Sequence, residues 1–161
     1  TTEIYTLSLH DALPISNAIV STSTNLLIAR LYTSRDYRLE PGATLRLTEG
    51  DLELGYQNHW IQATGGGVGG TITSTNGTLY VRQMDPTLTD VQIRAVLADD
   101  GATPMTVVKE GYGLVSFYGY NTYSGGTLIN TGTLYSLRSG NATQSALPPG
   151  QIGRASCRER V

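Results

Sequence analysis

Short runs in which apolar and polar residues alternate recur along the chain, and a period of two predicts β-strands. The segment 44–56 shows it clearly, because Leu45 and Leu47 fall on one face, as do Leu52 and Leu54. No stretch has the apolar spacing of a long helix. The other strand signals lie at 25–32, 71–81, 91–97, 113–119 and 127–137. We therefore predict an all-β fold.

Strand openings in which a leucine closely follows a glycine, together with strand signals at Ile61 and 91–93 that fill the gaps between them, give a step of about 16–20 residues, in the range of a stacked repeat. A sandwich more often spaces its strands at about 8–12 residues, so a solenoid with two or three short strands per turn fits better. In the segment 113–119, Leu114 is expected to face inward and Ser116 outward. The openings begin at Gly42, Gly77, Gly113 and Gly132. We expect these aliphatic side chains to stack inside in columns: Leu45, Ile72, Leu79, Ile93, Leu114, Leu128 and Leu134.

The composition agrees with many short strands joined by turns, since the chain has 19 glycines and 10 tyrosines and only 15% charged residues. A net charge of -2 gives no reason to expect a nucleic-acid partner. The longest apolar run is far shorter than the roughly 20 residues that span a bilayer, so we expect no membrane insertion by this segment.

The two ends differ in character from the middle of the chain. Residues 1–16 and 151–161 resemble translated adapter or vector sequence, and we expect them to lie outside the natural domain. The chain begins at Thr1 and not at a methionine, which we interpret as truncation. This leaves 17–150 as one β domain without cysteine, because Cys157 lies in the tail.

The segment 105–137 carries an ordered set of glycines and polar turn residues. A lysine–x–glycine–x–glycine–leucine strand opening is followed by an asparagine–threonine–tyrosine–x–glycine–glycine–threonine turn and a glycine–threonine–leucine strand. The matching residues are Lys109, Gly111, Gly113, Leu114, Asn121, Thr122, Tyr123, Gly125, Gly126, Thr127, Ile129, Asn130, Gly132, Thr133 and Leu134. This segment resembles the passenger-associated transport repeat of bacterial autotransporters, also called the autotransporter-associated β-strand repeat. Residues 17–104 resemble, more loosely, the region that precedes this repeat.

The resemblance implies a right-handed parallel β-helix and a place at the bacterial cell surface after export through the outer membrane. It also implies a C-terminal outer-membrane β-barrel elsewhere in the full protein, and no active site, since the shared residues of the repeat are structural. Phe117-Tyr118 departs from the small residues common there, so we expect a more aromatic outer surface.

Motifs that carry chemistry are weak. Ser8, His10 and Asp11 are neighbours in sequence, whereas catalytic triads converge in space. The GGGVGG run at 65–70 lacks the Gly-Lys-Ser/Thr ending of a phosphate loop. Cys157 and His59 fit no recognised metal spacing with His10. We therefore predict no catalytic residue, no cofactor and no metal, and we do not expect an enzyme.

Carboxylates and tyrosines leave alternatives open. Carboxylates on adjacent coils can serve a polysaccharide lyase or hydrolase, although a solvated strand face explains them more simply. Outward tyrosines either stack between strands or form a platform for glycan or host-surface ligands. The carboxylates are Asp51, Glu53, Asp85, Asp90, Asp99 and Asp100. The tyrosines assigned to a ligand-contact surface are Tyr80, Tyr118, Tyr123 and Tyr135.

Three functions follow from these features. The first is a rigid stalk in a secreted, autotransporter-type passenger that supports adhesion. The second is a module that binds glycans or a partner through the outward tyrosines. The third is a lyase or hydrolase.

Overall fold

The computed structural model describes residues 19–20, 26–33, 36–55, 60–85, 90–137, 147–148 and 152–154. Within these ranges the protein consists of strands and one three-residue 3₁₀ turn, η1 (Thr64–Gly66), which confirms the all-β prediction. No helix in the described part of the chain has the length and apolarity needed to cross a membrane.

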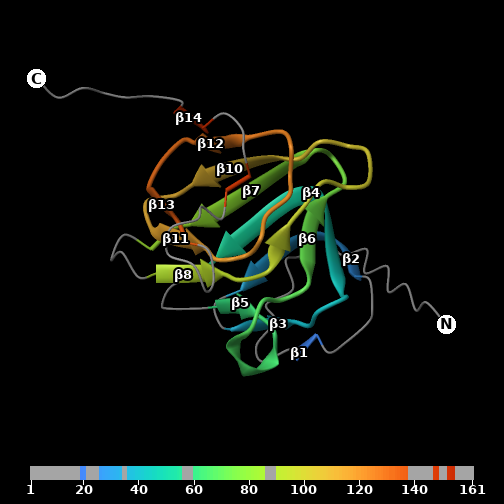
Figure 1. The fold of residues 1–161 in the computed structure, drawn as a ribbon. Coiled ribbons are helices and arrows are strands. Elements are labelled where there is room, and N and C mark those ends of the chain that lie inside the picture. Colours follow the sequence, from blue (N-terminus) through green and yellow to red (C-terminus); the bar gives the residue numbers. More distant parts are fainter. Residues whose placement is uncertain are drawn as a thin grey trace, which may run out of the picture.

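Two sheets contain all the strands (Figure 1). The six-stranded sheet has the order β1 (Ile19–Val20), β3 (Tyr37–Leu39), β5 (Trp60–Gln62), β8 (Asp90–Ile93), β11 (Leu114–Phe117) and β13 (Thr133–Ser136). The eight-stranded sheet has the order β14 (Ile152–Arg154), β12 (Thr127–Ile129), β10 (Thr106–Glu110), β7 (Thr78–Gln83), β4 (Thr44–Leu54), β6 (Thr71–Ser74) and β9 (Val96–Leu97), and β2 (Leu26–Thr33) also pairs with β4.

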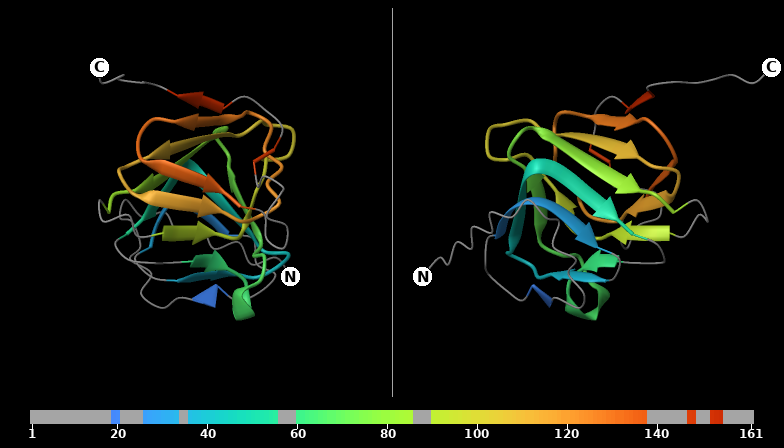
Figure 2. Two further views of the ribbon diagram at one scale, coloured as in Figure 1. Left: turned by 60° about the vertical axis from the view of Figure 1, so that its left-hand side comes forward. Right: turned by 180° about the vertical axis from the view of Figure 1, so that it is seen from behind.

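Every strand pair in both sheets is parallel. The chain passes repeatedly from one sheet to the other, except that β6 and β7, and β9 and β10, follow each other in the eight-stranded sheet. Figure 2 shows the six-stranded sheet rising from blue β1 to orange β13 in sequence order. Strand β14 falls in the 151–161 tail that the sequence sets apart, yet it pairs with β12. Each pass of the chain therefore lies on the one before it.

The predicted step of about 16–20 residues holds for some passes of the chain and is too short for others. The β1–β3 and β11–β13 pairs each have steps of 19 residues. The register pairs Ile61 with Ile93 and Ile93 with Phe117, which are steps of 32 and 24 residues. Some of the short intervals behind the prediction join strands of different sheets: Leu45 is in β4, whereas Ile61 is in β5. An interval between strands of different sheets is shorter than one full pass, which brings the chain back to the same sheet.

Aliphatic columns fill the space between the sheets, because alternation sends every second side chain inward. Leu45 pairs with Ile72, and Tyr37 pairs with Ile61 in the other sheet. These four side chains, with Leu79 and Ile93, are buried in the core. The inward prediction is therefore confirmed for Leu45, Ile72, Leu79 and Ile93.

The phase of β11 was predicted wrongly. Val115 and Phe117 are fully buried and pair with Val91 and Ile93, whereas Leu114 is half-exposed. Phe117 thus adds nothing to the outer surface. Ser116 alternates with the inward residues but is buried, and its hydroxyl donates to Asp90 at 2.6 Å. Two further predicted core residues are only partly buried: Leu128 and Leu134.

Strand β4 bends in the middle and serves two neighbours. Leu45 and Leu47 lie in the half that pairs with β6, while Leu52 and Leu54 lie in the half that pairs with β7. All four leucines are buried, as their alternation predicts. The bend falls at Gly50, whose φ of 69° suits glycine, and a Cβ there would meet the Thr78 carbonyl oxygen at 1.9 Å.

Candidate functional site

The four predicted ligand-contact tyrosines do not form one surface. Tyr80 lies on β7 of the eight-stranded sheet, with the Arg82 guanidinium 5.0 Å from its ring centre. Tyr135 lies on β13 of the six-stranded sheet and is 53% exposed. Tyr118 directly follows β11 and is half-buried. Only Tyr118 and Tyr135 therefore belong to the same sheet.

Tyr123 was wrongly placed on the surface. Its side chain is buried in the core, and its hydroxyl lies 2.6 Å from the Thr127 hydroxyl. Burial raises the pKa of Tyr123 to about 12, although the hydrogen bond with Thr127 acts in the opposite direction. The tyrosine of the repeat motif thus packs inside the fold and cannot contact a ligand there.

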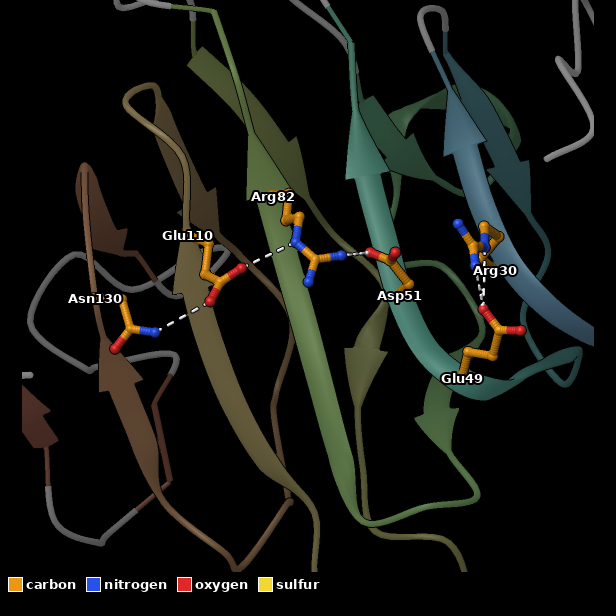
Figure 3. A network of polar contacts seen from close by, with 6 residues as sticks. All are labelled: Arg30, Glu49, Asp51, Arg82, Glu110 and Asn130. Atoms are coloured by element: carbon orange, nitrogen blue, oxygen red, sulfur yellow. Dashed lines mark hydrogen bonds and ion pairs between the residues drawn. The ribbon is translucent and has the colours of Figure 1, made fainter.

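The outer side of the eight-stranded sheet carries a ladder of charged and amide groups (Figure 3). Arg82 on β7 pairs with Asp51 on β4 and, at 2.9 Å, with Glu110 on β10. The Asn130 amide donates to Glu110 at 3.1 Å. Burial lowers the pKa of Arg82, but the contacts with Glu110 and Asp51 outweigh burial, so the pKa is raised. The ladder ties neighbouring strands together across three strand gaps.

A hollow of about 300 Å³ lies beside the end of this ladder. Its lining includes Arg82, Glu110, Tyr112 and Asn130. Tyr112 is 66% exposed there. The two charged groups of the hollow are the ones that already pair with each other, so this lining favours strand-to-strand cohesion over chemistry on a substrate.

The six predicted carboxylates lie on different parts of the fold. Asp51 and Glu53 share the outer face of β4, whereas Asp90 starts β8 in the other sheet. Asp100 pairs with Arg46 at 2.6 Å, and Asp85 is buried after β7. In the described ranges, no three His, Cys, Asp or Glu side chains gather closely enough to hold a metal ion.

Asp99 organises a turn. Its carboxylate accepts the backbone N–H of Met105 at 2.7 Å and of Ser124 at 2.9 Å, and the Ser124 hydroxyl at 2.7 Å. Burial alone would raise the pKa of Asp99, but these three donors outweigh it and the pKa is lowered. A carboxylate held in this way serves the backbone and not a substrate.

Lys109 is fully buried, on the inner side of β10. Its Nζ donates to the backbone oxygens of Glu110 at 2.6 Å, Gly111 at 3.0 Å and Thr131 at 3.4 Å. Burial lowers the pKa of Lys109 to about 8, although the nearby Glu110 carboxylate opposes this. A Cβ at Gly132 would lie 2.8 Å from the Nζ. The lysine and the glycines of the repeat motif therefore build the corner after β10.

The outer side of the six-stranded sheet differs in chemistry. The register aligns Trp60, Gln92, Ser116 and Tyr135 in one row across four strands. In the next row the Arg94 guanidinium lies between two rings, 5.7 Å from the centre of Trp60 and 5.2 Å from that of Tyr118. We call Trp60, Gln92, Arg94, Tyr118 and Tyr135 the aromatic face.

Hydrogen bonds fix the polar groups of the aromatic face. Arg94 Nη2 donates to Gln92 Oε1 at 3.0 Å, and Arg94 Nη1 donates to the Gly66 oxygen at 2.6 Å. The other end of the Gln92 amide donates to Asp90 at 3.0 Å. The rings of Trp60 and Tyr118 thus rest on a guanidinium that is itself held in place.

Sequence reasoning missed Trp60, Gln92 and Arg94. The signal available was the alternation in Trp60-Ile61 and in Gln92-Ile93-Arg94, which places these residues opposite a buried isoleucine. Their proximity depends on the register between strands separated by about thirty residues, which the sequence does not give. The residues Ser8, His10, Asp11, His59 and Cys157 lie outside the described part of the chain.

Comparison with models of known families, with curated proteins and with solved structures finds no match. The resemblance to the autotransporter repeat therefore stays a prediction from the residues of 105–137.

Proposed function

We propose that this chain is a segment of a right-handed parallel β-helix that forms a rigid stalk in an exported, autotransporter-type surface protein. The observation that carries the proposal is the parallel pairing throughout both sheets, in which each pass of the chain pairs with the next. Such stacking gives stiffness along one axis, because each pass contacts chiefly its two neighbours. A C-terminal β-barrel elsewhere in the full protein would anchor the stalk to the outer membrane.

The contacts of the motif residues support this role. Lys109 donates to two backbone oxygens of the corner after β10 and to the oxygen of Thr131 after β12. Asn121 accepts the backbone N–H of Leu97 at 2.8 Å in the neighbouring pass. Each of these side chains satisfies backbone groups at a place where the chain leaves a strand. These residues of the resembling segment thus stabilise the stacking of successive passes of the chain. The scattered and paired carboxylates give no support to a lyase or hydrolase.

Surface display tests the stalk. The chain is placed upstream of a β-barrel translocator in a Gram-negative host, and its exposure is measured by antibody labelling and resistance to external protease. We expect a displayed, protease-resistant segment. Val115→Asn, which puts an amide into the core, should become protease-sensitive, whereas Leu114→Asn on the half-exposed neighbour should remain resistant. Retention of the native chain inside the cell, or equal sensitivity of both variants, would contradict the proposal.

A further inference from the structure

The aromatic face has the form of a narrow strip. Trp60 and Tyr135 lie in one row three strand gaps apart, which is about 14 Å. Tyr118 lies two residues further along β11 than the Ser116 of that row, which is about 7 Å. A stable protein partner covers about 800 Å² on each side, many times the area of this strip. The dimensions suit a linear chain molecule that runs along the stack.

The rings are exposed and already oriented. Trp60 is 39% exposed and Tyr135 is 53% exposed, both large fractions for aromatic side chains on a sheet. The Arg94 guanidinium holds the rings of Trp60 and Tyr118. Rigid aromatic groups lose little conformational entropy when a ligand packs on them, so they are efficient contact surfaces. Flat, weakly polar C–H surfaces are the natural counterpart of such rings.

The polar groups between the rings indicate a neutral ligand. Arg94, Gln92 and Asp90 are linked in one hydrogen-bonded series, so the cation and the carboxylate offset each other. The guanidinium also donates to the Gly66 oxygen. No excess charge within this series favours an acidic or a basic chain. The side-chain amide of Gln92 carries a second N–H that can donate a hydrogen bond to a hydroxyl group.

From these observations we infer that the aromatic face binds a neutral, linear polysaccharide whose sugar rings stack on Trp60, Tyr118 and Tyr135 along the axis of the stack. Pyranose rings joined through equatorial bonds present alternating C–H faces and peripheral hydroxyls, which match rings that flank a polar row. This binding is independent of the stalk role, and either can fail without the other.

Fluorescence gives a direct test, because Trp60 is the only tryptophan in the chain. The full chain is titrated with cellohexaose, chitohexaose and xylohexaose, and binding to microcrystalline cellulose, chitin and insoluble xylan is measured by sedimentation. We expect at least one of the three sugars to change the tryptophan emission and to retain the protein on its polymer. Binding that leaves the emission unchanged would place the ligand elsewhere and overturn the inference.

Substitutions locate the site. Trp60→Ala and Tyr118→Ala should each weaken retention about tenfold, the loss expected for one stacking ring, and Tyr118→Phe should retain the native affinity. Tyr112→Ala is the matched control, because Tyr112 is 66% exposed but lies beside the eight-stranded sheet, so its retention should stay within about twofold. Unfolding is monitored in each variant so that loss of fold is not read as loss of binding.

Three further results would overturn the inference. They are no retention on any of the three polymers, equal losses for Tyr112→Ala and Tyr118→Ala, and retention that persists in the folded double variant Trp60→Ala/Tyr118→Ala. Because protease resistance of the displayed chain is measured separately, these results would leave the stalk proposal intact.

Discussion

The outer faces of the two sheets share one backbone geometry but use their side chains differently. On the eight-stranded sheet, Arg82 is paired on both sides with carboxylates from the adjacent strands. On the six-stranded sheet, Arg94 lies between two aromatic rings and donates to neutral oxygens. In the first arrangement the charged side chains bind one another across neighbouring strands of the sheet. The second arrangement leaves aromatic ring surface exposed to solvent. The outer side chains of the eight-stranded sheet therefore reinforce the stack, whereas those of the six-stranded sheet are available for contact.

The largest expected effect tests whether the two faces share a single interior. Val115 in the six-stranded sheet and Val81 in the eight-stranded sheet are both fully buried. An asparagine at either position buries an amide without partners, and we expect each to lower the free energy of unfolding by about 3–4 kcal/mol. Leu114→Asn is the control, with an expected loss below about 1.5 kcal/mol because Leu114 is half-exposed. Urea denaturation measures all three, and a silent substitution at Val81 or Val115 would mean that this side chain does not lie in the shared interior.

A smaller effect concerns the inner side of the eight-stranded sheet, where Lys109 has its pKa lowered to about 8 by burial. In the unfolded chain this pKa is about 10.4, so between these values the unfolded state binds the additional proton and stability rises with pH. We expect a gain on the order of 2 kcal/mol between pH 7 and pH 10. Above pH 10 stability should fall, because the pKa values of buried Tyr37 and Tyr123 are raised.

Chemical denaturation at a series of pH values measures this effect. Lys109→Met removes the titrating group, and its stability should be nearly flat from pH 7 to pH 10. If the native chain and the variant follow the same curve, Lys109 is not the group responsible.

The third test distinguishes the two arginines by their response to salt. Arg82→Met leaves Asp51 and Glu110 without their cation and should cost about 1 kcal/mol at low salt, since these groups are partly exposed. In 1 M NaCl that cost should shrink, because the Debye length falls to about 3 Å. Arg94→Met loses contacts with two rings, which is worth about 1 kcal/mol, and its cost should change little with salt. Equal salt dependence of the two variants would remove the distinction between the faces.

Alternation of apolar and polar residues predicted the strand positions and much of the interior, but not the phase of every strand. In 44–54 each pair of leucines is separated by one polar residue, and the phase shifts by one residue between the pairs, at the bend near Gly50. In β11 apolar residues occur at both phases, Leu114 on one side and Val115 and Phe117 on the other, and pairing with β8 decides which side turns inward. Local pattern cannot supply that information, because the partners lie about 24 residues away.

The candidate sites were harder to predict than the fold. Tyr123 lies outside the strands, so alternation does not apply to it. Its hydroxyl is hydrogen-bonded to that of Thr127 in the interior. The aromatic face joins residues 60, 94, 118 and 135. Nothing local marks these positions as neighbours, since each occupies a different pass of the chain. Such a face becomes visible only once the register is known.

The bend at Gly50 has a consequence for how the sequence can vary. Thr48 and Glu49 are exposed, and side chains of almost any size fit there. At the very next position a single methyl group would collide with the backbone of the neighbouring strand. In a collection of random substitutions of this chain, acceptance should therefore drop from nearly complete to almost none within one residue, and that abrupt boundary would mark the hinge of β4 without any coordinates.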